Sequence, residues 1–257
     1  MRKDTIIGFA ALLIIIIGIA LYAAMRPAPA KAPGIGAGIV LPAGGYREHA
    51  QYYDISADYA TSTPLLLSAG AEEDAAARAL MEGFVRDTIA QFKNDGNFDH
   101  LTSEDIHMMG FDQGRKEKLQ IVYLIASSPS TVSYIFTIYE DTLGAHGNLF
   151  FHTFTFDAKT GAALALADLF SPGARYLDTL SSISRAKLPG IIGPDADTSF
   201  ITGGTTPEDK NFENFFFDNK EFVVLFPPYQ VGPYSAGPQT LRIPVSDLAD
   251  ILKPSYR

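Results

Sequence analysis

Cysteine is absent from the 257 residues of this sequence. Its absence excludes a disulfide framework, a cysteine-ligated zinc site and a cysteine nucleophile. Histidine is scarce, with five in the chain, and no two of them lie three, four or five residues apart. Ligands on one helix or in a zinc finger would need such a spacing. The sequence therefore predicts neither a metal site nor a cofactor.

Positive charge is also in short supply, because 20 Lys and Arg face 29 Asp and Glu and leave a net charge of −9. Residues 1–45 carry a net +3, and removing that from −9 leaves −12 for residues 46–257. An acidic domain repels nucleic acid and anionic lipid headgroups, so no nucleic-acid partner is expected. A basic protein or a neutral polymer is compatible with this charge as a partner. Alternatively, the charge serves only to keep the domain soluble.

The longest apolar run is Ile6–Met25, twenty residues without a charge. A helix of that length spans the roughly 30 Å hydrocarbon core of a bilayer. Residues 5–25 are therefore predicted to be a single-pass transmembrane anchor that contacts the lipid bilayer through residues 6–25. Arg2 and Lys3 favour a cytoplasmic N-terminus, with residues 1–4 as a short stub. The rest of the chain would then lie outside the cell membrane.

A cleaved signal peptide is the alternative to an anchor. Ala28 and Ala30 are small residues at the spacing that a signal peptidase reads. The apolar run is longer than a usual signal-peptide core, which favours the uncleaved anchor. Residues 26–45, rich in Pro, Ala and Gly, are predicted to be a linker. In either case the domain that follows is expected to be exported.

Hydrophobic periodicity predicts an α+β fold with antiparallel sheets and two main helices, divided into residues 46–143 and 144–257. The expected helices are Ala71–Asn94, with Leu80 and Phe84 on its apolar stripe, and Pro172–Leu188. A loop is expected over residues 189–206. The expected strands are Tyr46–Tyr59, Leu119–Ser127, Thr131–Glu140, Asn148–Phe156, Phe215–Asp218, Phe222–Phe226 and a last one through Leu241 and Val245.

Turn-forming motifs occur in a characteristic order in the second half of the chain. They are Gly144-Ala145-His146, Asp157 with Thr160-Gly161, Leu166-Ala167-Asp168-Leu169-Phe170, and Tyr229–Gly237 before an Ile243-Pro244 strand. This order resembles the RsiV-like/PdaC-like extracytoplasmic domain family, shared by the anti-sigma factor RsiV and the peptidoglycan deacetylase PdaC. The likeness covers most of residues 46–257. Its motifs are specific for a fold and carry little information on chemistry.

The resemblance implies a two-part α+β domain that is exported and often tethered to the membrane. In RsiV-like members it senses a lysozyme, and in PdaC-like members it accompanies a separate deacetylase domain. This chain differs from both. Only residues 1–4 precede the predicted anchor, which leaves no cytoplasmic sigma-binding domain, and the Asp and His pairs of a deacetylase zinc site are not found.

No catalytic residue is predicted. Ser235 lies between Gly232 and Gly237, but the first glycine is one residue too distant for the Gly-x-Ser-x-Gly elbow of a hydrolase. Asp157 and Asp168 have explanations as turn and cap residues. An acid–base pair among the other carboxylates would need a closeness in space that sequence does not reveal.

Three residues are the candidates for ligand binding: Tyr229, Tyr234 and His146. The two tyrosines fall in a predicted loop, where an aromatic ring can contact a glycan or a protein. His146 falls in a turn, where the alternative is a hydrogen bond to the hairpin backbone. For His152, on a strand face with several Phe, we expect a partly buried structural role.

These observations favour a membrane-anchored extracytoplasmic binding or sensor module at the cell envelope, without catalysis. Its expected partner is a lysozyme-like protein or the peptidoglycan of the cell wall. The alternative is a cell-wall hydrolase, or an accessory enzyme associated with a deacetylase, that uses Asp, Glu and His. The sequence leaves the oligomeric state open.

Overall fold

A computed structural model describes residues 39–59, 70–194 and 196–257, which lie within one compact unit. The helices are α2 (Ala71–Gly96), α3 (Ser103–Met109), α4 (Tyr176–Ile192) and α5 (Thr198–Gly204). The strands are β1 (Tyr46–His49), β2 (Tyr53–Ala57), β3 (Glu117–Ser127), β4 (Thr131–Asp141), β5 (Asn148–Asp157), β6 (Phe215–Asp218), β7 (Glu221–Phe226) and β8 (Gln239–Pro244). The predicted α+β class, with two sheets, is confirmed.

The first sheet has five strands in the order β1-β2-β3-β4-β5. All its neighbours are antiparallel except β2 and β3, which run parallel. The prediction of purely antiparallel sheets was therefore wrong at this pair. The chain between β2 and β3 contains α2, and a parallel pair needs such a crossover to return to the same end of the sheet.

The predicted single strand over Tyr46–Tyr59 is also corrected. It is a hairpin, in which β1 and β2 pair with His49 opposite Asp54. The N–H of Ala50 donates to the carbonyl of Tyr53 at 2.9 Å and closes the turn. Alternation of side chains continues through so tight a turn, which explains why the sequence looks like one strand.

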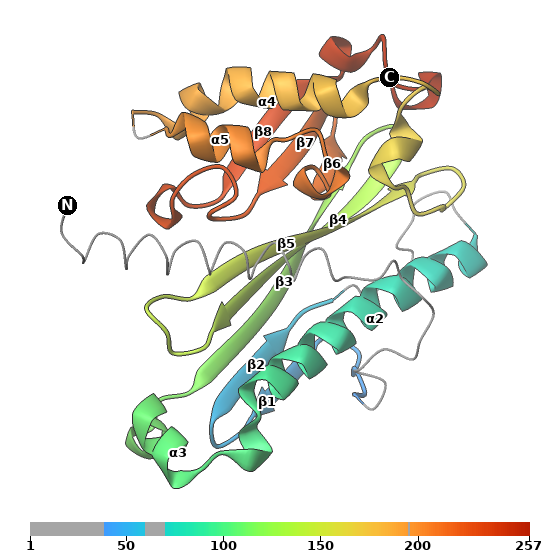
Figure 1. Cartoon of the computed structure of the whole chain (residues 1–257). Coiled ribbons are helices and arrows are strands. Elements are labelled where there is room, and N and C mark those ends of the chain that lie inside the picture. The colour runs from blue at the N-terminus through green and yellow to red at the C-terminus, as the bar shows by residue number, and fades with distance from the viewer. Residues whose placement is uncertain (1–38, 60–69, 195) are drawn as a thin grey trace, which may run out of the picture. The chain divides into compact units, whose positions relative to one another are not determined.

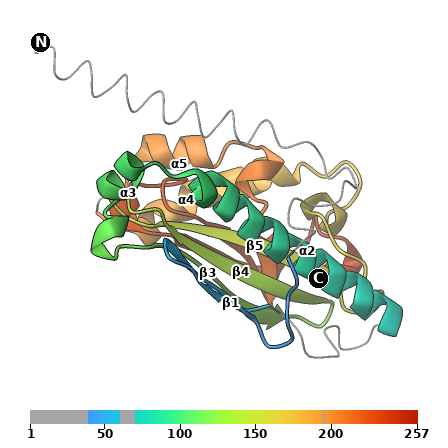
Figure 2. The ribbon, with the colours of Figure 1, turned by 90° about the horizontal axis from the view of Figure 1, so that it is seen from below.

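Helix α2 lies along one face of this sheet (Figures 1 and 2). Its buried stripe advances four residues at a time, through Ala77, Met81, Val85 and Ile89. Leu80, which was expected on this stripe, is 49% exposed. The small side chain of Ala77 is buried against the strands. The buried face of the helix is therefore centred one residue away from the stripe that its large side chains predicted.

The second sheet has the order β6-β7-β8. One of its faces forms a core with α4 and α5, and Phe222 and Phe226 of β7 are completely buried there. The other face meets the first sheet through a small cluster of Ile135, Phe216 and Val223. The layers therefore follow in the order α2, first sheet, second sheet, and α4 with α5 (Figure 1).

The region predicted as a loop over residues 189–206 is largely helical. Helix α4 continues through Pro189 to Ile192, and α5 follows. Leu188 is completely buried and Ile192 packs against the same core, so burial holds the last turn of α4 in spite of the proline. The prediction of a loop rested on the low helix propensity of the proline and the glycines of this segment. The core contacts of Leu188 and Ile192 outweigh that propensity.

Pro244 ends β8, which is an edge strand of the second sheet, where a proline is tolerated. The boundary predicted between residues 143 and 144 falls in the loop between β4 and β5, which pair along their whole length in one sheet. The division of the chain at that boundary stays a prediction.

Within the described residues, no helix combines the length and the apolar composition needed to cross a bilayer. Helix α2 is long enough, but acidic and basic side chains occur along it. The predicted anchor, residues 5–25, and most of the predicted linker lie outside the described residues. Both stay predictions.

A buried carboxylate in the first sheet makes stability depend on pH. Glu117 of β3 is only 6% exposed. Burial raises the pKa of its carboxyl, and the nearby carboxylates of Asp141 and Glu140 raise it further. A carboxyl whose pKa is higher in the folded chain stabilises the fold fully below its unfolded pKa. That contribution is lost as the pH rises through the folded value.

Glu117→Gln is therefore expected to increase the free energy of unfolding at pH 7 to 8 by about 1 kcal/mol, because no charge then needs burial. Near pH 4 the two proteins should be equally stable. Urea denaturation across this range measures the difference. A variant that is less stable than the wild type at every pH would show that the Glu117 carboxylate makes a favourable contact.

Candidate ligand-binding surface

Two loops from different sheets meet at the surface. Residues 142–147 connect β4 to β5 and contain His146, and residues 227–238 connect β7 to β8 and contain Tyr229 and Tyr234. The imidazole of His146 stacks on the ring of Tyr234, with centroids 3.7 Å apart and planes inclined by 16°. Tyr229 lies beside both, at 6.0 Å from His146 and 5.6 Å from Tyr234. We call these three residues the aromatic cluster.

Hydrogen bonds hold the cluster in one arrangement. The hydroxyl of Tyr234 donates to the carbonyl of Gly147 at 2.9 Å, and Nδ1 of His146 lies 3.0 Å from the same oxygen. A carbonyl only accepts, so Nδ1 carries a proton. In the neutral ring Nε2 is then the acceptor, and the hydroxyl of Tyr229 donates to it at 3.0 Å. The predicted contact of His146 with the hairpin backbone is thus present, together with two contacts that the sequence did not predict.

The backbone is strained on both sides of the meeting point. Tyr229 has φ = 71° and Leu143 has φ = 60°. Bulky residues rarely adopt this left-handed region, which costs about 1–2 kcal/mol relative to glycine. Tyr229 is nevertheless 48% exposed. Strain of this kind is found more often at functional sites than elsewhere in proteins.

The loop of Tyr229 is fixed by its next residue. The side-chain amide of Gln230 donates to the carbonyls of Gly204 and Asn211, both at 3.0 Å. Val231 is buried in the core beneath the loop. A Cβ atom on Gly204 would lie 1.8 Å from the carbonyl oxygen of Gln230, so only glycine permits this approach. The end of α5 therefore sets the position of Tyr229.

The histidine side of the cluster depends on another glycine. A Cβ atom on Gly147 would lie 2.2 Å from the hydroxyl oxygen of Tyr139 on β4. Tyr139 thus covers Gly147, whose carbonyl accepts from two members of the aromatic cluster. Both loops are placed by a close approach at glycine, Gly147 in one case and Gly204 in the other.

Residues 167–246 match a family described as a protein of unknown function (DUF3298). This part of the chain is therefore similar to the DUF3298 family. It contains α4, α5 and the whole second sheet, with Tyr229 and Tyr234. His146 precedes it, so the aromatic cluster joins the DUF3298-like part of the chain to the five-stranded sheet.

The chain is 33% identical over 143 residues to a protein of Bacillus subtilis named peptidoglycan-N-acetylmuramic acid deacetylase PdaC. The match covers 55% of this chain and 31% of that protein, so the chain spans about a third of the relative's length. The predicted resemblance to PdaC is confirmed.

Solved structures of the DUF3298 family resemble the chain as well. One from Bacteroides fragilis has a TM-score of 0.59 and 15% identity, and the alignment covers 82% of this chain and 92% of that one. It shows that the fold is shared. A second, from Pseudomonas aeruginosa, has a TM-score of 0.47 and 14% identity, and covers 87% of this chain and 98% of that one.

The residues that were predicted to be structural have structural partners. Asp157 accepts from the backbone of Lys159 and Thr160 at 2.9 and 2.8 Å, and Asp168 accepts from the backbone of Ala165 at 2.9 Å. His152 stacks on Phe84 of α2 with centroids 4.3 Å apart. None of these belongs to the aromatic cluster.

No three His, Asp or Glu side chains of the described residues are grouped closely enough to hold a metal ion. The predicted lack of a metal or cofactor, and the binding roles of Tyr229, Tyr234 and His146, stay predictions. Sequence reasoning missed Gly147, Gly204 and Gln230. Glycine in a turn or at a helix end has a local explanation. The contacts that these glycines make, with Tyr139 across the hairpin and with Gln230 of a distant loop, are not visible in the sequence.

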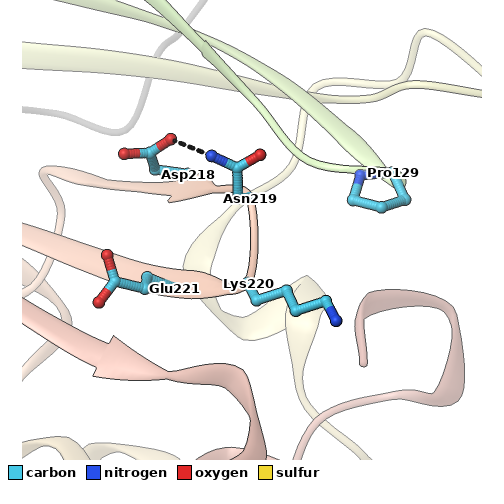
Figure 3. A pocket seen from close by; sticks show the side chains of 5 residues that line it. All are labelled: Pro129, Asp218, Asn219, Lys220 and Glu221. Atoms are coloured by element: carbon cyan, nitrogen blue, oxygen red, sulfur yellow. Dashed lines mark hydrogen bonds between the residues drawn. The ribbon is translucent and has the colours of Figure 1, made fainter.

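A shallow hollow lies elsewhere, where the β6–β7 turn meets the turn after β3 (Figure 3). It is lined by Pro129, Asp218, Asn219, Lys220 and Glu221. The carboxylates of Asp218 and Glu221 both bind the guanidinium of Arg242, at 2.9 and 2.7 Å. Asn219 donates its backbone N–H to the carbonyl of Ser127 at 2.9 Å. The ion pairs link the strands of the second sheet, and the bond of Asn219 joins that sheet to the first. The hollow is not a candidate site.

Proposed function

We propose that the chain is a non-catalytic binding module of the cell envelope that recognises peptidoglycan glycan through the aromatic cluster. The observation that carries this proposal is the exposed ring of Tyr229, held by strained backbone and by the bond to His146. Sugar rings present flat apolar faces that stack on aromatic side chains. A neutral glycan is also compatible with the net charge of −9.

The relation to PdaC supports this choice of ligand, because the name of that protein states that it acts on peptidoglycan. We propose further that residues 5–25 anchor the chain in the cell membrane and that the DUF3298-like part of the chain lies on the extracytoplasmic side. The apolar run and the residues that flank it support that orientation.

Binding can be measured by co-sedimentation of the purified full chain with insoluble peptidoglycan. Tyr229→Ala is expected to weaken binding by about tenfold, the effect of losing one aromatic stacking contact. Tyr229→Gly should lose the same affinity and gain about 1 kcal/mol of stability, because glycine adopts the left-handed backbone without strain. This second variant separates loss of the ring from loss of the fold.

Met108→Ala is the matched control, since Met108 is an exposed apolar side chain on α3. It should bind like the wild type. Tyr229→Phe keeps the ring and removes its bond to His146, and should fall between the wild type and Tyr229→Ala. Full binding by Tyr229→Ala and Tyr229→Gly would refute the proposal. Release of soluble products from the peptidoglycan would instead favour an enzyme.

A lysozyme-like protein is the second candidate, and the acidic charge is the observation that favours it. A chain with a net charge of −9 attracts a basic protein and accelerates its association. Calorimetric titration with a basic lysozyme at low and at high salt tests this candidate. Heat of binding that disappears at high salt supports it, and absence of heat at low salt refutes it.

A further inference from the structure

β5 is an edge strand of the first sheet whose outer side is unpaired over much of its length. In the described residues it pairs with β4 only. Its last part is covered, because Leu164 donates to the carbonyl of Thr155 and Asp157 donates to the carbonyl of Ala162. Backbone groups alternate in direction along a strand, so these bonds identify the odd-numbered residues as those that point outward.

Leu149, Phe151 and Thr153 therefore each present one N–H and one C=O to the outside of the sheet. No backbone or side-chain partner of these groups occurs among the described residues. An outer row of this kind is a template for a further strand. Proteins usually protect such an edge with a charge or a proline, and residues 148–156 contain neither.

We infer that β5 pairs with β5 of a second copy of this chain, antiparallel and centred on Phe151. In this register Phe151 of each copy faces Phe151 of the other, and Leu149 faces Thr153. Every free N–H and C=O of the three residues then finds a partner across the seam. This pairing is symmetric about Phe151, so the same residues of both copies form the interface, as a two-fold symmetric (isologous) dimer requires.

Charge and exposure favour a second copy as the occupant. Each chain carries −9, but the strand from Asn148 to Phe156 contains no Asp, Glu, Lys or Arg, so the seam brings no such like charges together. Phe150, on the face of the sheet that bears α2, is 45% exposed. In the proposed register it lies opposite His152 of the other copy, so pairing covers an aromatic ring that the single chain leaves open to solvent.

Pairing has a consequence for the surface described above. β5 begins directly after the loop of His146, and His146 lies five residues before Phe151, the centre of the proposed seam. The two histidines of a dimer would then be separated by about ten residue spacings, roughly 30 Å. Two aromatic clusters at this separation would bind a polymer with repeated units more tightly than one.

The absence of cysteine makes this pairing open to a direct test with the full chain. Facing positions of a hydrogen-bonded antiparallel pair have Cα atoms about 5.5 Å apart, which suits a disulfide. Phe151→Cys is expected to form a covalent dimer on mild oxidation. Leu149→Cys and Thr153→Cys should not do so alone, but a mixture of these two variants should give a covalent heterodimer.

A second measurement does not depend on cross-linking. Phe151→Pro removes an outward N–H and leaves the bonds to β4 intact, so the strand should persist while its pairing is lost. Light scattering of the native protein should give twice the 27.8 kDa chain mass for the wild type and for Phe151→Ala, and one chain mass for Phe151→Pro. Cross-linking that is equal at all three positions, or absent at Phe151, would overturn the proposal, and so would an unchanged mass in Phe151→Pro.

Discussion

Replacement of Gly204 by alanine is expected to lower the free energy of unfolding by about 2–3 kcal/mol, the range found when atoms are forced into a well-packed site. The added Cβ atom would lie 1.8 Å from the carbonyl oxygen of Gln230. That oxygen belongs to backbone, so no side-chain rotation relieves the overlap. The loop must move away from α5, and the two bonds of the Gln230 amide are stretched or lost.

Gly203→Ala provides a matched control at the adjacent position of the same helix. A Cβ atom there meets nothing within 4 Å. Alanine should stabilise the helix at this position by about 0.5–1 kcal/mol, because glycine is the poorer helix former. Urea denaturation compares the two variants with the wild type. Equal stability of Gly203→Ala and Gly204→Ala would mean that the loop of Gln230 yields at little cost.

The same pair of variants connects the fold to the proposed function. Gln230 directly follows Tyr229, so a displaced loop carries the exposed ring away from His146. Gly204→Ala should therefore weaken binding to peptidoglycan about as much as Tyr229→Ala, by roughly tenfold. Gly203→Ala should leave binding unchanged. A folded Gly204→Ala variant with full affinity would place the contact with the glycan elsewhere.

Local patterns predicted most of the strands. The run Phe222–Phe226 and the alternation around Leu241 became β7 and β8, and the predicted elaborate loop connects them. The prediction of these segments was correct because residues on the buried and the exposed face of a strand alternate along the sequence. Phe215 and Phe216, in the predicted strand that became β6, are also buried.

Tertiary contacts decided the segments that were predicted wrongly. α5 and the last turn of α4 contain glycine and proline, and they are helical because the core beside the second sheet covers them. The parallel pairing of β2 and β3 depends on the path of a long crossover, and local periodicity carries no information on it. Leu80 was misplaced because the size of a side chain is a weaker guide to the buried face than the fit of the whole helix.

For the aromatic cluster too, the sequence predicted the single residues but not the contacts between them. Tyr229, Tyr234 and His146 could each be selected from sequence as polar aromatic residues in turns. Their meeting could not be predicted, because it requires the β4–β5 loop and the β7–β8 loop to approach across two sheets. The left-handed conformation of Tyr229 was also invisible, since most residues in that conformation are glycine and the sequence offers several glycines nearby.

Phe222→Ala is expected to have the largest effect on stability, a loss of about 3–5 kcal/mol. Phe222 is completely buried on β7, the central strand of the second sheet. Its ring contacts the rings of Phe170, Phe215 and Phe217 with centroids 5.4 to 6.4 Å apart. Alanine leaves a cavity among aromatic rings that are held by their own backbone segments and cannot collapse to fill it.

Hydrogen exchange in Phe222→Ala tests whether the two sheets unfold together or separately. Each sheet has its own large core, and only Ile135, Phe216 and Val223 are buried in the cluster between them. Hydrogen bonds between Phe215 and the side chains of Thr153 and Thr155 also join the sheets. Because the apolar contact is small, we still expect the second sheet of Phe222→Ala to open while the first remains folded. Hydrogen exchange should then quicken in β6 to β8 and stay slow in β3 and β4.

Phe136→Ala makes the same substitution in the core of the first sheet, where Phe136 is completely buried. Here the order should be reversed, with faster exchange in β3 and β4. Equal acceleration of both sheets in each variant would show that the described residues unfold as one cooperative unit. In that case the two loops of the aromatic cluster would unfold only when both cores unfold. If the second sheet opens separately, the contact between His146 and Tyr229 would break before the first sheet unfolds. A ligand that binds both residues would then stabilise the second sheet more than the first.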